Sequence, residues 1–373
     1  MTALSDTEYL SRAVTLAARG LYTTDPNPRV GCVLVKDGHV IGEGWHGRAG
    51  GPHAERMALS HAGATASGAT VFVTLEPCSS TGRTGPCTTA LIEANVARVV
   101  CSGIDPNPEV AGRGISALRD AGIHVDVGVA GDAAAALNPG YLSRMTRGRP
   151  FVRTKLAVSL DGRTALANGQ SQWITGPAAR VDVHRWRARS SAIMTGIGTV
   201  LADDPSLDAR LEDPEAAVQQ PARVVLDSAC RIPPEARLLS IPGAVLIFTN
   251  QAESKDEGEL VAQGATIERV GGSSQCDLAQ VLNRLGELEF NEVWVEAGAA
   301  LNGALVREGL IDELIIYMAP QLLGSSATGM FAIDSLDSLE QRISLTYQDV
   351  RRVGDDLRII AQPSTVTSQQ SER

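Results

Sequence analysis

His53-Ala54-Glu55, Glu76-Pro77-Cys78 and Cys87 form a spaced motif in the first quarter of this 373-residue chain. One histidine and two cysteines offer Zn²⁺ three protein ligands and leave the fourth tetrahedral position for water, which is the arrangement of a catalytic site. Glu55 is placed to move protons next to the metal. Each part of the motif stands where a strand or loop leads into a helix, so the motif predicts an α/β fold around a zinc site.

The order of these residues is typical of zinc deaminases, in which a glutamate that does not bind the metal acts as general acid and base. Known members close the motif as P-C-x-x-C, whereas the eight residues 79–86 separate Cys78 from Cys87 here. Two other interpretations stay open. Glu55 also fits an ordinary first-turn helix residue, and the cysteines also fit a structural zinc site with His46 or His61 as fourth ligand.

The composition is typical of a globular, water-soluble protein. Hydrophobic residues make up 43% and charged residues 20% of the chain, and its length suits two domains with their own cores. No apolar run approaches the ~20 residues that span a bilayer, and the first residues lack the pattern of a signal peptide. We therefore expect a cytoplasmic protein, whose remaining cysteines are buried apolar thiols: Cys32, Cys101, Cys230 and Cys276.

The formal net charge of −10 argues against a nucleic-acid partner, because binding to a phosphate backbone needs a concentrated basic surface. A small phosphorylated substrate remains compatible with this charge, since a local basic cluster is enough to hold one phosphate. The strongest such cluster consists of Arg180, Arg185, Arg187 and Arg189.

Hydrophobic periodicity divides the chain into two α/β halves. In the first half we expect helices at 9–19, 55–62, 88–95 and 115–122 and strands at 30–35, 39–45, 70–75, 96–103 and 125–129. In the second half we expect helices at 178–189 and 300–308 and strands at 151–158, 192–196, 223–227, 244–249, 292–296, 313–318, 343–350 and 357–361. The polar stretch before Pro150 marks the boundary. The predicted domains are 1–147 and 151–363, followed by a disordered tail at 364–373.

The blocks around the metal motif carry a resemblance to a known family. Residues 27–35 read NPRVGCVLV, residues 42–46 read GEGWH, and residues 74–78 read TLEPC, with Gly82-Arg83-Thr84 before the second cysteine. These blocks resemble the deaminase half of the bifunctional riboflavin-biosynthesis deaminase/reductase family, whose motif has the long loop between the cysteines. The loop after Cys78 reads Ser79-Ser80-Thr81 where that family has Ser-His-Tyr.

The resemblance implies a cytidine-deaminase-like α/β/α domain with a pyrimidine pocket. Asn27 and His46 would line this pocket, and the loop 82–84 would help to close it. Plainer explanations are a turn residue for Asn27 and a polar group at a strand end for His46.

Three further blocks follow in the second half: KLAVSLDG at 155–162, SQWIT at 171–175 and GIGTVLADDP at 196–205. No G-x-G-x-x-G follows the first strand, which argues against a Rossmann domain. Residues 296–303, EAGAALNG, form a better pyrophosphate cradle, because a strand end, a glycine and a helix start present free N–H groups to an anion. An ordinary β-α turn has the same pattern.

In this order the blocks resemble the reductase half of the same family, a domain similar to dihydrofolate reductase that uses NADPH. The resemblance implies NADPH contacts at Ala157, Trp173, Thr199, Asp203, Ser228, Gly298, Ala299, Ala300, Leu301, Asn302, Gly303 and Ala304. It implies substrate contacts at Ser171, Arg187, Leu207, Arg210 and Glu296.

Two pairs of charged residues stand out in the second half of the chain. Arg187 and Arg210 are suited to clamp a ribosyl phosphate bidentately, although either also fits a solvated surface charge. Lys155 and Asp203 are candidate catalytic residues that handle the proton at the sugar while hydride reaches its C1 carbon. A structural ion pair is the alternative for Lys155 and Asp203.

Motif and resemblance together predict two consecutive steps of riboflavin biosynthesis. The first is hydrolytic deamination of 2,5-diamino-6-(5-phosphoribosylamino)pyrimidin-4(3H)-one. The second is NADPH reduction of the ribosyl group of 5-amino-6-(5-phosphoribosylamino)uracil to ribityl. Alternatives are another nucleotide or tRNA-adenosine deaminase fused to a reductase, and a non-catalytic zinc-stabilised binding module. We expect a homo-oligomer whose partner is the small phosphorylated pyrimidine, with no nucleic acid and no membrane.

Overall fold

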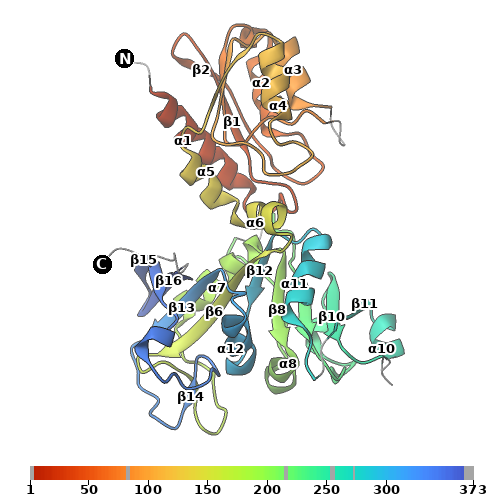
Figure 1. Cartoon of the computed structure of the whole chain (residues 1–373), viewed down its shortest axis with the longest axis vertical. Coiled ribbons are helices and arrows are strands. Elements are labelled where there is room, and N and C mark those ends of the chain that lie inside the picture. Colours follow the sequence, from red (N-terminus) through yellow and green to blue (C-terminus); the bar gives the residue numbers. More distant parts are fainter. Residues whose placement is uncertain (1–3, 81–84, 214–216, 253–256, 272–273, 365–373) are drawn as a thin grey trace. The chain divides into compact units, whose positions relative to one another are not determined.

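The computed structural model describes residues 4–80, 85–213, 217–252, 257–271 and 274–364. The chain divides into two compact units, whose elements are labelled in Figure 1. The first unit is Met1–Pro150 with the short pieces Ala217–Gln219 and Gly286–Asn291, and the second unit comprises the rest of the chain. The predicted tail falls almost wholly outside the described residues. None of the described helices is long and apolar enough to cross a membrane.

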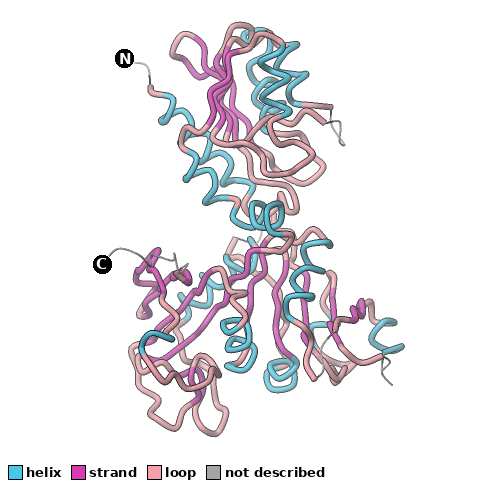
Figure 2. The backbone as a smooth tube through the Cα atoms, in the orientation of Figure 1, coloured by secondary structure: helices cyan, strands magenta, loops and turns pink. Residues whose placement is uncertain are grey.

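The first unit is a sheet between two layers of helices (Figures 1 and 2). Its strand order is β2 (His39–Trp45), β1 (Gly31–Lys36), β3 (Thr70–Val73), β4 (Arg98–Cys101) and β5 (His124–Val127). β1 runs antiparallel to β2 and β3, and the remaining pairs are parallel. The helices are α1 (Asp6–Ala17), α2 (Ala54–Ala62), α3 (Cys87–Glu93), α4 (Arg113–Asp120), α5 (Gly131–Leu137) and α6 (Pro139–Arg147), with short 3₁₀ turns η1 (Ala18–Gly20) and η2 (Gly63–Ala66).

The alternation of side chains along β1 explains the three layers. Cys32 and Leu34 join a buried cluster with α2, α3 and α4, while Val33 and Val35 join a second cluster with α1 on the opposite face. Successive side chains of a strand point to opposite faces, so an almost wholly apolar strand is covered on both sides. This arrangement brings the starts of α2 and α3, which carry the metal motif, to the same face of the sheet.

The second unit is built on one nine-stranded sheet. Its order is β11 (Ala265–Arg269), β10 (Val245–Thr249), β9 (Ala222–Leu226), β8 (Ala192–Gly196), β12 (Glu292–Val295), β6 (Phe151–Ser159), β13 (Glu313–Ala319), β16 (Asp356–Pro363) and β15 (Leu345–Val353). The first seven strands are parallel, whereas β16 and β15 are antiparallel to their neighbours. β7 (Arg163–Ala165) and β14 (Thr328–Gly329) form a small separate ladder.

The helices of the second unit are α7 (Pro177–Arg189), α8 (Ile197–Asp203), α9 (Arg237–Ser240), α10 (Glu257–Ala262), α11 (Leu278–Glu287) and α12 (Ala299–Arg307), with the 3₁₀ turn η3 (Leu339–Gln341). α7 packs against the sheet through a buried core. The rings of Trp186 and Trp294 are stacked there, with their centroids 5.8 Å apart. β12 is inserted between β8 and β6, although it follows them in sequence. The carboxyl ends of these parallel strands therefore meet where the strand order changes, which is where open α/β sheets bind ligands.

The α/β class predicted for both halves is confirmed, and the expected elements are present with ends that shift by a few residues. Several elements were missed, including α5, α6, α8 and β11. Cys32, Cys101, Cys230 and Cys276 are buried thiols outside any disulfide, as predicted.

Candidate functional site

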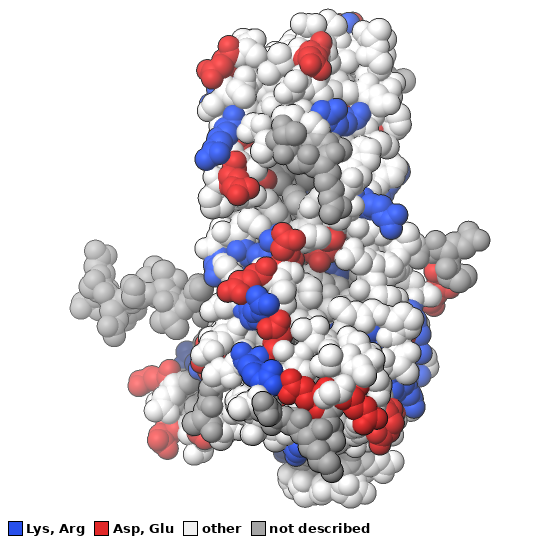
Figure 3. Space-filling view, turned by 90° about the vertical axis from the view of Figure 1, so that its right-hand side faces the viewer, with Lys and Arg blue, Asp and Glu red and all other residues white. Residues whose placement is uncertain are grey.

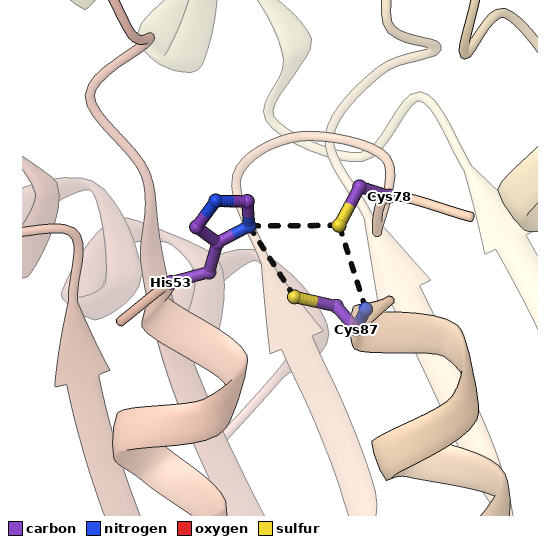
Figure 4. A group of neighbouring side chains, drawn as sticks. All are labelled: His53, Cys78 and Cys87. Atoms are coloured by element: carbon purple, nitrogen blue, oxygen red, sulfur yellow. Dashed lines mark hydrogen bonds between the residues drawn. The ribbon is translucent and has the colours of Figure 1, made fainter. Parts of the chain in front are cut away.

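The first unit brings three metal-binding side chains together (Figure 4). His53 immediately precedes α2, Cys78 lies in the loop after β3, and Cys87 is the first residue of α3. His53 Nδ1 is 3.5 Å from Cys78 Sγ and 3.4 Å from Cys87 Sγ. A nitrogen and a sulfur ligand of tetrahedral zinc lie about 3.6 Å apart, given bonds of about 2.1 and 2.3 Å. The spacing and chemistry of these donor atoms therefore fit Zn²⁺.

The two sulfur atoms interact closely with each other. The backbone N–H of Cys87 donates to Cys78 Sγ at 3.4 Å. The hydrogen bond from Cys87, with that from His53, lowers the pKa of Cys78 to about 4, while the hydrogen bond to Cys78 and burial raise the pKa of Cys87. As a coupled pair the thiols thus share one negative charge, and a bound dication would stabilise both as thiolates.

Glu55 lies in the first turn of α2, as the plainer interpretation held, but it is only 3% exposed. Glu55 lines the same pocket as His53 and Cys78. Burial raises the pKa of its carboxyl. A surface helix residue stabilised by the dipole would be solvated, whereas Glu55 is buried beside His53 and Cys78, which is the environment expected for a carboxyl group that transfers protons.

The pocket has a volume of about 540 Å³ and includes Asn27 and His46. His46 Nδ1 is 3.0 Å from the carbonyl oxygen of Pro52, and His46 Nε2 is 3.0 Å from Asn27 Nδ2. Burial lowers the pKa of His46, so the neutral ring donates from Nδ1 to Pro52 and accepts the Asn27 amide at Nε2. This hydrogen bond leaves the carbonyl oxygen of Asn27 as the group that accepts from a ligand.

The alternative of a closed structural zinc site is not supported by the residues that the structure describes. Their one metal-binding group contains His53, Cys78 and Cys87 without a fourth side chain. Both ring nitrogens of His46 are hydrogen-bonded elsewhere, and His61 is exposed at the end of α2. Of the substrate loop expected after Cys78, Ser80 lines the pocket, whereas residues 81–84 lie outside the described residues.

In the second unit, three of the predicted NADPH contacts follow the carboxyl ends of adjacent strands. Thr199 lies in α8 after β8, Ser228 follows β9, and Gly298 caps α12 after β12. The glycine caps of α8 and α12, Gly196 and Gly298, leave the first N–H groups of both helices without a side-chain partner. A Cβ atom added to Gly298 would meet no other atom within 4 Å. The open, N–H-lined edge fits a pyrophosphate group.

Arg187 and Glu296 form a bidentate pair at this edge that is mostly buried, with side chains 14% and 15% exposed. Arg187 Nε and Nη2 donate to the two carboxylate oxygens of Glu296 at 2.6 and 2.9 Å, and Trp294 Nε1 donates to the same carboxylate at 2.7 Å. Burial alone would raise the pKa of Glu296, but the charges of Arg187 and Lys155 outweigh burial and lower it to about 2. Arg187 was expected to bind a phosphate bidentately, but its Nε and Nη2 groups bind the Glu296 carboxylate instead.

The suggested ion pair between Lys155 and Asp203 is not present. Burial lowers the pKa of Lys155, and the carboxylate that opposes this shift belongs to Glu296. Asp203 is exposed at the end of α8. Lys155 and Glu296 are therefore the two groups that act on each other across this edge.

The predicted substrate residues Leu207 and Arg210 belong to a loop held from two sides. Arg187 Nη1 donates to the Asp208 carbonyl at 3.1 Å, and His184 Nδ1 accepts the Arg210 N–H at 3.2 Å. The side chain of Arg210 is 66% exposed. Trp173, 70% exposed beneath the Arg180 guanidinium, and Ser171 lie in a different loop before α7.

Each of the two units matches a known protein family. The family model described as the RibD C-terminal domain matches residues 150–359, and the cytidine and deoxycytidylate deaminase zinc-binding region matches residues 4–103. The riboflavin biosynthesis protein RibD of Escherichia coli (strain K12) is 48% identical, over 95% of this chain and 98% of its own length. The chain belongs to the RibD family. It is an enzyme of riboflavin biosynthesis with a zinc-binding deaminase domain and an NADPH-dependent reductase domain.

Solved RibD structures share the whole architecture. Acinetobacter baumannii RibD superposes with a TM-score of 0.90 at 46% identity, covering 96% of this chain and 99% of that one. A deaminase/reductase from Thermotoga maritima reaches a TM-score of 0.85 at 32% identity over the same shares. These matches over nearly the full length set aside both a nucleotide or tRNA-adenosine deaminase fused to an unrelated reductase and a non-catalytic binding module.

A second group of residues that line the deaminase pocket was not predicted from the sequence. Asp105 and Asn107 line the pocket together with Tyr141. Tyr141 donates to Asp105 Oδ1 at 2.8 Å, and the Asn107 N–H donates to the same oxygen at 2.9 Å. A signal was present, because Asp-Pro-Asn-Pro occurs twice, at 25–28 and at 105–108. Both copies contribute to the pocket.

Proposed function

We propose that the first unit deaminates 2,5-diamino-6-(5-phosphoribosylamino)pyrimidin-4(3H)-one by hydrolysis, and that the second unit reduces the ribosyl group of the product, 5-amino-6-(5-phosphoribosylamino)uracil, with NADPH. The Thermotoga maritima relative is described as a diaminohydroxyphosphoribosylaminopyrimidine deaminase and 5-amino-6-(5-phosphoribosylamino)uracil reductase. The observation that carries the proposal is the pocket that Glu55 and Asn27 line together with His53 and Cys78, two members of the metal-binding group. The proposed domains are 1–147 and 151–363.

In the deaminase unit, His53, Cys78 and Cys87 would hold the zinc ion. When bound, Zn²⁺ supplies a Lewis acid that makes water nucleophilic near neutral pH. Glu55 takes a proton from the attacking water and returns protons to the ring nitrogen and to the amine that leaves as ammonia. The Asn27 carbonyl oxygen, oriented by His46, accepts a hydrogen bond from an N–H group of the pyrimidine.

In the reductase unit, the N–H groups at the starts of α8 and α12 would bind the NADPH pyrophosphate. The cofactor residues are Ala157, Trp173, Thr199, Asp203, Ser228 and Gly298, Ala299, Ala300, Leu301, Asn302, Gly303 and Ala304. Ser171, Arg187, Leu207, Arg210 and Glu296 would contact the substrate. Arg210 is the more exposed of the two arginines and would serve as the main phosphate contact, while Arg187 would contribute its positive charge beside Glu296.

The proton in the reductase step would be handled by Lys155 and Asp203. C1 of the ring-opened sugar would receive the hydride that NADPH supplies when bound, and one proton must reach the nitrogen or oxygen that takes the electron pair. Burial lowers the pKa of Lys155, which makes its ammonium a better proton donor. Asp203, exposed at the carboxyl end of α8, would restore that proton from solvent.

Removal of the metal tests the two-site proposal. After dialysis against a chelator, we expect ammonia release from the diaminopyrimidine substrate to fall to background and to return with stoichiometric Zn²⁺. NADPH oxidation with the deaminated intermediate should continue unchanged, because the second unit uses none of the three metal-binding residues. Zinc-loaded protein that shows neither activity with authentic substrates would refute the proposed function.

We further propose that the chain forms homo-oligomers through β15. This strand is the edge of the nine-stranded sheet, and apolar side chains along it are exposed, namely Leu345, Tyr347 and Val350. An edge strand with unpaired N–H and C=O groups pairs readily with another strand. The β15 strand of a second copy of the chain can be that partner, with the two copies related by a two-fold axis.

Light scattering during size exclusion tests this pairing. We expect the native chain to elute with a multiple of the monomer mass and a double variant, Tyr347→Lys with Val350→Lys, to elute as a monomer. Val261→Lys changes an exposed apolar residue of α10 and should leave the mass unchanged. A native chain that is monomeric at the enzyme concentrations of the activity assay would rule the pairing out.

The proposed location is the cytoplasm, whose reducing conditions keep the thiols of Cys78 and Cys87 available for metal. The proposed partner is the small phosphorylated pyrimidine rather than a nucleic acid. Acidic and basic side chains are interspersed on the face shown in Figure 3, and the net charge of −10 disfavours a polyanion.

A further inference from the structure

Glu76 is a buried carboxylate that the deaminase mechanism does not use. It is 4% exposed and lies two residues before Cys78. Among the residues that the structure describes, no Lys or Arg forms an ion pair with it. Backbone N–H groups bind the carboxylate instead. Burying a carboxylate in this way costs free energy unless its oxygens accept enough hydrogen bonds.

Four N–H groups from one segment converge on this carboxylate. Oε2 accepts from Asp105 at 3.1 Å and from Gly112 at 2.9 Å. Oε1 accepts from Gly114 at 2.8 Å and from Ile115 at 3.1 Å. The last three donors belong to the start of α4, whose cap residue Gly112 has no side chain to accept them. Glu76 thus caps a helix from a distant part of the chain, with its negative charge at the favourable end of the helix.

The same contact joins two parts of the active site. The loop that begins at Asp105 supplies the pocket residues Asp105, Asn107 and Val110. Glu76 is attached through Pro77, whose φ angle is fixed by its ring, to the metal-binding Cys78. A shift of the Glu76 side chain would therefore move both the sulfur atom and the pocket wall.

Close packing reinforces this link. A Cβ atom added to Gly114 would lie only 1.9 Å from the Pro77 carbonyl oxygen, so the start of α4 can approach Pro77 only because residue 114 is glycine. On the other side of the segment, the Cys78 carbonyl accepts the Thr88 N–H at 3.1 Å. The Glu76–Cys78 segment is held between α3 and α4.

We propose that Glu76 is a positioning residue that fixes the Cys78 arm of the metal site relative to the Asp105–Val110 pocket wall. It is not a catalytic residue, because its two oxygens are already occupied by four N–H donors. The inference rests on the proposed function only in taking Cys78 as a zinc ligand. Loss of supporting hydrogen bonds around a metal site typically costs 10–100-fold in metal affinity or activity.

The test is Glu76→Gln, which keeps the shape but turns an NH₂ group toward two N–H donors. We expect zinc affinity and kcat/KM for deamination to fall by about 10–100-fold. The thiolate-to-metal absorption of the Co²⁺-substituted protein should also change, which a loss of stability alone would not cause. NADPH oxidation with the deaminated intermediate should stay at the native rate.

Glu43→Gln is the matched control, because Glu43 lies in the same unit but pairs with Arg12 at the surface; it should behave as the native chain. Gly114→Ala is a second test that displaces Pro77 without removing a charge, and it should weaken the metal site in the same direction. If Glu76→Gln is unfolded at the assay temperature, the same measurements on Gly114→Ala test the inference. Native metal affinity and a native Co²⁺ spectrum in the folded variant would overturn the inference. If the native chain itself shows no thiolate-to-cobalt band, the proposed ligand set fails instead.

Discussion

Glu55→Gln is expected to lower kcat for deamination by about 10²–10⁴-fold, the usual contribution of a general acid–base group. The amide is isosteric but can neither take a proton from water nor return one to the leaving amine. The three metal-binding side chains are untouched, so the zinc content should equal that of the native chain. The measurement is ammonia release at saturating substrate, with zinc determined on the same sample.

Two comparisons make the Glu55 result specific. NADPH oxidation with the deaminated intermediate should be unchanged in the variant, since the reductase site lies in the other unit. Glu93→Gln, at an exposed position near the end of α3, should retain native deamination. A Glu55→Gln protein with full zinc and a deamination rate within a few-fold of native would remove Glu55 from the mechanism.

Glu296→Gln is expected to destabilise the second unit by about 3–5 kcal/mol, the usual cost of removing one partner of a buried pair. The change leaves the Arg187 guanidinium and the Lys155 ammonium without their shared carboxylate. Urea unfolding followed by tryptophan fluorescence measures this effect, because Trp186 and Trp294 are in the core beside the pair. Glu212→Gln, which breaks the exposed pair with Arg185, should cost at most about 1 kcal/mol.

The same pair predicts how stability depends on pH. The pKa of Glu296 is about 2 in the folded chain, below the value of about 4.3 in an unfolded chain. Its contribution is therefore complete above about pH 5 and is lost as the pH falls toward 2. The native second unit should lose stability over this range more steeply than Glu296→Gln. Identical pH profiles, or an unchanged urea midpoint at pH 7, would contradict the role given to the pair.

The metal-binding group was predictable because its signal is local. His53, Cys78 and Cys87 each stand at a recognisable start of a helix or in the loop before one, and zinc imposes its own requirement on ligand type and number. The strands of the sheet cores were predictable for a similar reason, since apolar runs such as residues 31–35 have few alternatives to burial. Helix α5 was missed because its GDAAAAL sequence carries almost no contrast between apolar and polar faces.

The partners of the charged residues were not predictable, since they depend on tertiary contact. Arg187 was expected to hold a phosphate, yet it meets Glu296, 109 positions later, because β12 is inserted beside β8 and places its end near α7. Glu76 gave no sign of its role for the same reason. Its four donors come from a loop and helix some 30 to 40 positions away, and no pattern within the TLEPC block indicates them.

The start of α4 also limits how this deaminase unit can recognise a phosphorylated substrate. The N-terminus of a helix is a ready anion-binding site, but here the internal carboxylate of Glu76 already neutralises it. A substrate phosphate brought to α4 would meet a negative charge instead of free N–H groups. Phosphate recognition in this unit therefore falls to groups other than the N-terminus of α4.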